Sequence, residues 1–396
     1  MTNAADRRVA ITGLGVVAPC GLGKDAFWNG LLGPGLVGVG QAVYVDEWDP
    51  TPYYASPKDA RRADLCEQFA IAAASEAIAQ AGELTATPHR IGTIFATGVG
   101  GIFTLEEQIL VRLERGERRV SPFLVPMMMP NAPGASISMR YGLQGPNETI
   151  TTACAAGTHA ITYAARLIKW GLADAIVTGG AEHAGTPTSI ASFSNMTALS
   201  SSGTSRPFDT DRDGFIMGEG SAVLVLEEWS LAEARGATIL GEVLGGGSNA
   251  DAHHITAPRP DGSGAVTCMR LALAEAGLTP ADIRQVNAHG TSTPLNDAAE
   301  AAAVASVFGD HRPAVTSIKG VTGHALGAAG ALEAAAVVLS FVKRQIPPTA
   351  NTKVLGDGID VDVVMGSPRD WEPGPTISNN FGFGGHNGSV VLAPPS

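Results

Sequence analysis

Short apolar runs alternate along the chain with alanine-rich segments of helical periodicity. Apolar residues recur at helical spacing in 67–81 and 265–276, and these segments end at Gly82 and Gly277, which are suitable helix C-terminal caps. Apolar runs rich in β-branched residues are typical of buried strands and lie at 91–97, 175–178 and 222–226. The alternation predicts an α/β protein.

Two pairs of short segments resemble each other. Residues 79–82 (AQAG) match 274–277 (AEAG), at the ends of the two predicted helices. Residues 153–157 (ACAAG) match 323–327 (GHALG), and each of these opens an alanine-rich helix. The matches indicate two related halves separated by unequal insertions; chance likeness among alanine- and glycine-rich segments is the alternative.

The composition is that of a folded protein with many tight turns. Hydrophobic residues make up 44% of the chain and charged residues 16%, which excludes disorder driven by charge. The 49 glycines among 396 residues are too many for a helix bundle. The net charge of −12 argues against nucleic acid as a partner, and an acidic partner needs a local basic patch.

The cysteines and the chain start indicate a reducing compartment. Cys20, Cys66, Cys154 and Cys268 lie far apart without a CxxC pair, so neither a disulfide framework nor a zinc cluster is predicted. The N-terminus lacks the apolar region of a secretory signal. The longest apolar stretch, 334–342, is too short to cross a bilayer. We expect a cytoplasmic protein without membrane association.

Three motifs begin like ligand sites but do not complete them. Residues 13–18 (GLGVVA) fit a dinucleotide fingerprint, but Pro19 interrupts the helix that should face the pyrophosphate. Residues 209–214 begin like a calcium loop, but Glu219 is one residue out of register for ligation. His253 and its neighbour His254 have no further ligands. No metal site is predicted.

A cysteine follows a predicted strand at the start of a predicted helix. Residues 149–154 (TITTAC) read as the strand end and 155–168 as the helix, which places Cys154 where free amides and the helix dipole stabilise a thiolate. Small neighbours leave room for a thioester. The alternative is a small, buried, apolar cysteine.

Two histidine motifs and a glycine-rich turn favour the nucleophile. His289 lies in NAHGTST (287–293) and His324 in KGVTGHALGAAG (319–330), each beside glycine at a strand or loop end. The turn at 379–387 (NNFGFGGHN) has amides able to form an oxyanion hole. Each motif alone is compatible with a structural role, but together they indicate one site.

With these motifs the chain resembles the β-ketoacyl-[acyl-carrier-protein] synthases. The likeness is to the elongating synthase II type and its relatives in bacterial polyketide assembly, within the thiolase superfamily. It rests on 12–15 (TGLG), 121–126 (SPFLVP), 152–154 (TAC), 179–182 (GGAE), 205–215 (SRPFDTDRDGF), the two histidine motifs and 381–385 (FGFGG). The resemblance implies a five-layer αβαβα fold of two related halves, 1–240 with Cys154 and 241–396 with His289 and His324.

The resemblance also implies a mechanism. Cys154 accepts an acyl chain from a carrier protein, and the amides of Cys154 and Phe383 form the oxyanion hole. A malonyl-carrier thioester then loses CO₂, its enolate attacks the acyl-Cys154 carbonyl, and His289 and His324 donate hydrogen bonds to the thioester oxygen. No free cofactor is expected, because the phosphopantetheine arm belongs to the acyl carrier protein.

Further site residues are implied with less direct roles. Lys319 is expected at the reacting centre and Glu333 at the substrate, although a structural ion pair between them is the open alternative. Thr291 and Thr293 match positions that bind the phosphopantetheine arm, and Phe383 matches a gate. Acyl-pocket positions are Val99 and Phe193, together with Leu124 and Val125 from a partner subunit.

Several related functions compete with this interpretation. A degradative thiolase has a second cysteine where this chain has 384–387 (GGHN), and an initiating synthase pairs one histidine with asparagine. A non-catalytic chain-length factor lacks the cysteine that is present here as Cys154. We therefore expect a condensing enzyme that forms a homodimer or pairs with a chain-length-factor-like subunit. The short segment 33–63 and the Ala-Ala-Gly after Cys154 favour a role in polyketide synthesis over one in fatty-acid synthesis. The alternative is ordinary sequence drift among fatty-acid synthases.

Overall fold

The computed structural model describes residues 7–396, in which strands and helices alternate as predicted. The strands of the first half are β1 (Val9–Ala18), β2 (Gly21–Leu22), β3 (Ile91–Ala96), β4 (Asn147–Ile150), β5 (Ala175–Glu182) and β6 (Gly220–Glu228). Those of the second half are β7 (Gly241–Ala250), β8 (Gln285–Asn287), β9 (Ala314–Thr316), β11 (Asp362–Val363), β13 (Thr376–Gly382) and β14 (His386–Ala393). A separate small ribbon pairs β10 (Gln345–Ile346) with β12 (Arg369–Asp370).

The two halves share one strand order. It runs β1-β6-β5-β3-β4 in the first half and β7-β14-β13-β8-β9 in the second, where β11 follows. In both, the first two pairings are antiparallel and the last two parallel. The expected relation between the halves is confirmed. A short antiparallel pairing of β1 with β7 joins everything into one twelve-stranded sheet. The division into separate domains at residue 240 stays a prediction.

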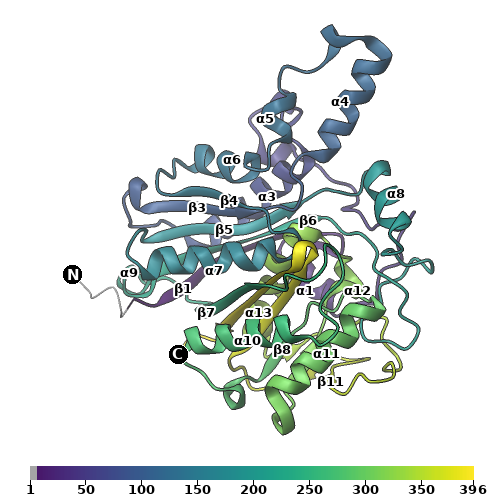
Figure 1. Cartoon of the computed structure of the whole chain (residues 1–396). Helices are drawn as coiled ribbons and strands as arrows, with labels where there is room; N and C mark the ends of the chain where they lie inside the picture. The colour runs from purple at the N-terminus through teal and green to yellow at the C-terminus, as the bar shows by residue number, and fades with distance from the viewer. Residues whose placement is uncertain (1–6) are drawn as a thin grey trace.

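Four helices build the remaining layers. They are α3 (Leu65–Ala81), α7 (Ala156–Lys169), α10 (Ser263–Ala276) and α13 (Ala329–Lys343). α3 covers the outer face of the first half and α10 that of the second, while α7 and α13 lie between the halves and contact strands of both (Figure 1). Three separate apolar cores fill these spaces. The five-layer thiolase-like arrangement is confirmed.

The matched segments occupy equivalent places in the two halves. Residues 79–82 and 274–277 end α3 and α10, whereas 153–157 and 323–327 lead into α7 and α13. Gly277 ends α10 in the left-handed conformation, at φ 67° and ψ 26°. Gly82 also has a positive φ of 75°, but its ψ of −161° lies outside that region, so this cap differs from the predicted type.

The central helix α13 is unusually apolar. Together with the turn before it, the segment Leu326–Lys343 is long and apolar enough to cross a membrane, with a mean hydropathy of 1.6. This candidate is longer than the stretch expected from the sequence. However, 89% of it is buried inside the protein, where α7 and strands of both halves surround it. Burial on every side accounts for its composition, as for other core helices.

One segment projects from the layered body. It carries α4 (Ile102–Arg115) and α5 (Leu124–Met128) and stands clear of the sheet (Figure 1). Its exposed apolar side chains are Phe103, Ile109, Leu110, Leu113, Phe123, Val125 and Met129. The other helices are α1 (Lys24–Leu31), α2 (Pro57–Ala60), α6 (Ala132–Tyr141), α8 (Pro187–Asn195), α9 (Trp229–Ala234), α11 (Pro294–Phe308) and α12 (Lys319–Thr322).

Two of the three rejected motifs have structural roles. Gly13 and Gly15 lie on β1 against α3, where an added Cβ would come within 2.1 Å of the carbonyl oxygen of Ala77 or Ala73. They therefore allow close helix–sheet packing. The carboxylate of Asp209 accepts hydrogen bonds from the backbone amides of Asp211, Lys353 and Val354, and these bonds connect two loops.

Candidate active site

Cys154 lies in a tight turn at the start of a central helix. The turn Ala153–Ala155 immediately precedes α7, and Ala153 has a φ of 50°, which is uncommon outside glycine. β4 ends at Ile150, so the strand is shorter than the predicted 149–154 run. The turn leaves Cys154 only 7% exposed, and its side chain lines the main cavity.

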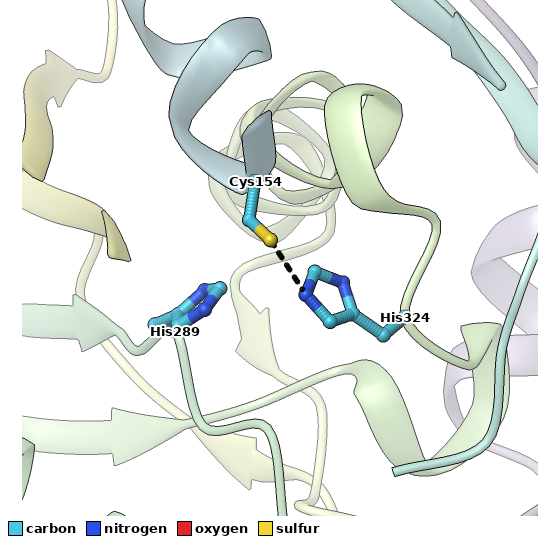
Figure 2. Close-up of side chains that lie close together, drawn as sticks. All are labelled: Cys154, His289 and His324. Carbon is cyan, nitrogen blue, oxygen red and sulfur yellow. Dashed lines mark hydrogen bonds between the residues drawn. The ribbon is translucent and has the colours of Figure 1, made fainter. Parts of the chain in front are cut away.

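Two histidines from distant segments reach the same sulfur. His324 follows α12, and its Nε2 lies 3.2 Å from Sγ of Cys154. His289 follows β8, and its ring centroid is 5.3 Å from that of His324. One ligand atom from each of the three side chains lies within 4.8 Å of the other two (Figure 2). The structure brings the predicted nucleophile and both predicted histidines together.

The hydrogen bonds of His289 determine where its proton resides. Its Nδ1 is 3.2 Å from Nδ2 of Asn380 and 3.4 Å from Nζ of Lys319. Both neighbours are donors, so Nδ1 accepts and the proton of the neutral ring lies on Nε2. Burial, the charge of Lys319 and the proximity of His324 hold the pKa of His289 well below its usual range. His289 is therefore a fixed, neutral N–H donor in the cavity.

Lys319 and Glu333 form a buried ion pair behind His289. Both side chains are 1% exposed, and Lys319 also donates to the carbonyl oxygen of His289 at 2.5 Å. Glu333 accepts from Nδ2 of Asn380 at 2.8 Å. Neither Lys319 nor Glu333 lines the cavity, so neither is placed to contact the substrate directly. Of the two expected roles, the structure favours the structural ion pair. They act through the ring of His289.

The surroundings of His324 are less polar. Its amide donates to the carbonyl oxygen of Ile216, and the edge of its ring meets Phe215 at a centroid distance of 5.0 Å. Among the described residues, none hydrogen-bonds Nδ1 of this histidine. Burial and the charge of Lys319 hold its pKa well below the usual range. The neutral ring is thus free to carry its proton on either nitrogen.

The resting thiol differs from the sequence expectation. Burial raises the pKa of Cys154 to about 11, although the charge of Lys319 and the amides of Phe383 and Cys154 oppose the shift. Removal from water therefore outweighs the stabilisation of a thiolate that was expected from the helix start. The stable resting state is a neutral thiol beside a neutral imidazole.

Two backbone amides face the sulfur. The N–H groups of Phe383 and Cys154 point toward Sγ, and Gly382 packs so closely that an added Cβ would lie 3.0 Å from the Cys154 nitrogen. Gly384 follows with a φ of 82°, a conformation that suits glycine. This turn presents donors at the position where an oxyanion on an acyl-Cys154 develops.

A cavity of about 550 Å³ opens onto these groups. Five predicted substrate or gate residues line it: Val99, Phe193, Thr291, Thr293 and Phe383. The hydroxyls of Thr291 and Thr293 are 2.9 Å apart, and the rings of Phe193 and Phe383 are 6.2 Å apart. Leu124 and Val125 do not line the cavity of this chain, because they belong to the projecting α5.

Three residues contribute in ways that the sequence motifs did not reveal. Asn380 orients His289, as described above. Glu300, eleven positions after His289, accepts the amides of His289 and Gly290, each at 2.8 Å. No local pattern identifies Glu300; Asn380 lies within a motif that was interpreted only as a turn.

The third residue, Glu182, links the acyl pocket to the segment that carries His324. It is fully buried and accepts the amides of Gly98 at 2.6 Å and Gly327 at 2.9 Å. Thr97 and Val99 also donate to it, at 3.2 and 3.4 Å. Burial raises its pKa to about 7. Its motif, 179–182, supported the family resemblance without assigning this role.

Comparisons with known proteins agree with this geometry. The family model for the β-ketoacyl synthase N-terminal domain matches residues 34–232, and that for the C-terminal domain matches 240–353. The chain is 42% identical to a protein named 3-oxoacyl-[acyl-carrier-protein] synthase 2 from Synechocystis sp., with 99% of each chain covered. It is 42% identical to the protein of the same name from Vibrio harveyi, with 98% of each covered.

Solved structures with a similar fold come from polyketide systems. One is a type II polyketide acyl-carrier protein in complex with its ketosynthase bound to the hexaketide. The TM-score is 0.90 and the sequence identity 30%, and the match covers 98% of this chain and 100% of that chain. Another is the ishigamide ketosynthase/chain length factor: TM-score 0.89, 33% identity, with the same coverage.

Proposed function

Since the chain belongs to the β-ketoacyl synthase family, we propose that it joins an acyl group held on Cys154 to malonyl-[acyl-carrier protein] and releases β-ketoacyl-[acyl-carrier protein]. The observation that carries this proposal is the 3.2 Å contact between Sγ of Cys154 and Nε2 of His324 at the wall of a cavity. The reaction serves chain elongation in fatty-acid or polyketide assembly. It uses no free cofactor, because the phosphopantetheine arm arrives on the carrier protein.

Acyl transfer to the enzyme uses the neutral Cys154–His324 pair. As Sγ attacks the thioester carbonyl, Nε2 of His324 takes the thiol proton. The negative charge on the carbonyl oxygen is met by the amides of Cys154 and Phe383. The bond to the carrier sulfur then breaks, and His324 returns the proton to that sulfur. The enzyme is left as acyl-Cys154 with a neutral His324.

Condensation uses His289 as a fixed donor. The malonyl carboxylate leaves as CO₂, and its bonding electrons move into an enolate whose oxygen accepts from Nε2–H of His289 and from His324. The enolate carbon attacks the acyl carbonyl and the carbon–sulfur bond to Cys154 breaks. The thiolate that departs takes up one proton from solvent water, which restores the resting thiol and balances the negative charge that the malonyl carboxylate brought in. One donor of this kind contributes about 3 to 4 kcal/mol to lowering the barrier.

We further propose a carrier protein and a second subunit as partners, in the cytoplasm. Two pairs of adjacent, exposed arginines, Arg61–Arg62 and Arg118–Arg119, offer local positive charge on this acidic chain. The Cζ atom of Arg62 lies 4.5 Å from the centroid of the Phe123 ring, which belongs to the projecting segment. The exposed apolar side chains of α4 and α5 suit a subunit interface. A homodimer, or a heterodimer with a chain-length-factor-like subunit, would bring Leu124 and Val125 to the partner's pocket.

Transfer of an acyl group from a purified carrier protein tests the function. We expect intact-mass spectrometry to show one acyl adduct on the wild-type chain and none on Cys154→Ala, with Cys20→Ala as the matched thiol control. Addition of malonyl-carrier protein should discharge the adduct and yield a β-ketoacyl product whose length identifies the pathway. An adduct that persists in Cys154→Ala would refute the proposal.

A chain-length factor is the second candidate. Such a subunit needs no nucleophile, whereas Cys154 here is paired with a histidine and faced by two amides. The same experiment separates the two functions, because a non-catalytic subunit acquires no adduct without a catalytic partner.

A further inference from the structure

The active-site side chains are also metal ligands. Among residues 7–396, Cys154, His289 and His324 form the one group of three or more histidine, cysteine or acidic side chains whose ligand atoms lie close enough to hold an ion. Thiolate and imidazole are the ligands that zinc prefers. The other cysteines lie outside this group. The catalytic cavity is therefore a candidate metal site.

The distance between Cys154 and His324 is close to that between two ligands of one zinc ion. Zinc–sulfur and zinc–nitrogen bonds of about 2.3 and 2.0–2.1 Å at a tetrahedral angle place the two ligand atoms about 3.6 Å apart. Sγ of Cys154 and Nε2 of His324 are 3.2 Å apart, so a shift of a few tenths of an ångström is enough. Nδ1 of His324 has no hydrogen-bond partner among the described residues, so it can hold the ring proton while Nε2 binds the ion.

His289 is prevented from joining them. A metal on its Nε2 would require the ring proton on Nδ1, but that atom faces two donors, Nδ2 of Asn380 and Nζ of Lys319. Lys319 is held in this position by the buried ion pair with Glu333. His289 therefore keeps its proton on Nε2, from where it can donate a hydrogen bond to a water ligand.

We propose that Sγ of Cys154 and Nε2 of His324 bind a thiophilic divalent cation such as Zn²⁺, with cavity water completing the coordination, and that Lys319 and Asn380 exclude His289. The ion replaces the thiol proton, which leaves to solvent, so no electrons are transferred. The cavity of about 550 Å³ has room for the water ligands. Because the ion and an acyl group occupy the same sulfur, each excludes the other; this consequence rests on the proposed function, whereas the binding does not.

Cobalt(II) tests the site because a thiolate bonded to it gives a charge-transfer absorption. We expect one such band when the chelator-treated full chain is titrated with Co²⁺, and its displacement by Zn²⁺. The band should be absent in Cys154→Ala and unchanged in Cys20→Ala. Affinity should fall about tenfold or more in His324→Ala but less than about threefold in His289→Ala. No band in the wild-type chain, or equal losses in both histidine variants, would overturn the proposal.

Asn380→Asp tests the exclusion of His289. A carboxylate at this position can accept a proton from Nδ1, which is the arrangement that orients zinc-bound histidines. We expect about tenfold tighter Co²⁺ binding, abolished when His289→Ala is added. Circular dichroism establishes that the variant folds. If it folds and binds Co²⁺ no more tightly than wild type, the assigned role of Asn380 is wrong; the histidine comparison tests the two-ligand site independently.

Discussion

The two active-site histidines lie in the same cavity but in opposite surroundings. Around His289, polar groups are connected without a gap: Lys319, Asn380 and Glu333 on the ring side, and Glu300 on the backbone. Around His324, the ring meets Phe215 and the thiol, and its Nδ1 has no partner among the described residues.

Because of this difference, one histidine serves as a fixed hydrogen-bond donor and the other can take up and return a proton. A ring whose Nδ1 faces donors has only one neutral tautomer, so His289 always presents a donor to a developing oxyanion. A ring with an unengaged nitrogen can accept a proton and return it, as transfer of the Cys154 thiol proton requires. The hydrogen bonds on the far nitrogen, rather than the position of the ring in the cavity, determine which task each histidine performs.

Removing the charge behind His289 should have the largest effect on stability. Lys319→Met leaves the Glu333 carboxylate buried without its partner, so we expect the free energy of unfolding to fall by about 3–5 kcal/mol. The control Lys343→Met removes only a surface contact with Asp25 and should cost at most about 1 kcal/mol. Denaturant titration measures both, and equal midpoints would contradict a buried pair.

Deleting each ring separates the two functions kinetically. We expect CO₂ release from malonyl-carrier protein to slow about 10²- to 10³-fold in His289→Ala and in His324→Ala, because each loses an oxyanion donor. Only His324→Ala should also slow acylation of Cys154, followed by time-resolved intact-mass spectrometry. Normal CO₂ release in both variants, or equal acylation rates, would count against the division of roles.

Glu182→Gln weakens the anchor on the acyl-pocket side. Gly98 and Gly327 both donate to Oε2 of Glu182, and the single oxygen of glutamine can still accept from them. The amide nitrogen that replaces Oε1 cannot accept the N–H of Val99, so we expect a loss of about 1–3 kcal/mol of stability. Since Val99 lines the cavity, the product-length distribution should change as well. Unaltered product lengths would limit Glu182 to a purely structural role.

The same carboxylate also predicts a pH dependence. Burial raises the pKa of Glu182 to about 7, above the value of about 4.3 in an unfolded chain. Between these values the folded chain binds the additional proton, so its contribution to stability is present at low pH and lost as pH rises toward 7. Stability measured from pH 5 to 8 should fall less in Glu182→Gln than in wild type; parallel curves would contradict the shift.

The smallest expected effect is on the rate at which Cys154 is alkylated, which should rise about tenfold per pH unit. Because burial raises the thiol pKa to about 11, the thiolate fraction is still rising at pH 9. The rate with iodoacetamide, followed by intact mass on chelator-treated protein, should therefore increase without a plateau between pH 7 and 9. A plateau below pH 9 would show that the helix terminus outweighs burial after all.

Much of the architecture was predictable from local patterns. Alternating apolar runs and helical segments predicted the α/β class, and two short matches predicted the repeat that the strand order confirms. The match of 153–157 with 323–327 was the more informative one. It places Cys154 and His324 at equivalent starts of α7 and α13, which accounts for their meeting across the centre of the molecule.

The sequence by itself determined the fold class, the related halves and the three side chains of the reacting centre, because periodicity and short motifs are local properties. Only the tertiary structure decided where the protons reside: a thiol rather than a thiolate, one fixed imidazole and one free to switch. It also decided that Glu333 stays behind the site. These outcomes depend on burial and on donors from segments far apart in the chain, and they exist only once those segments pack together.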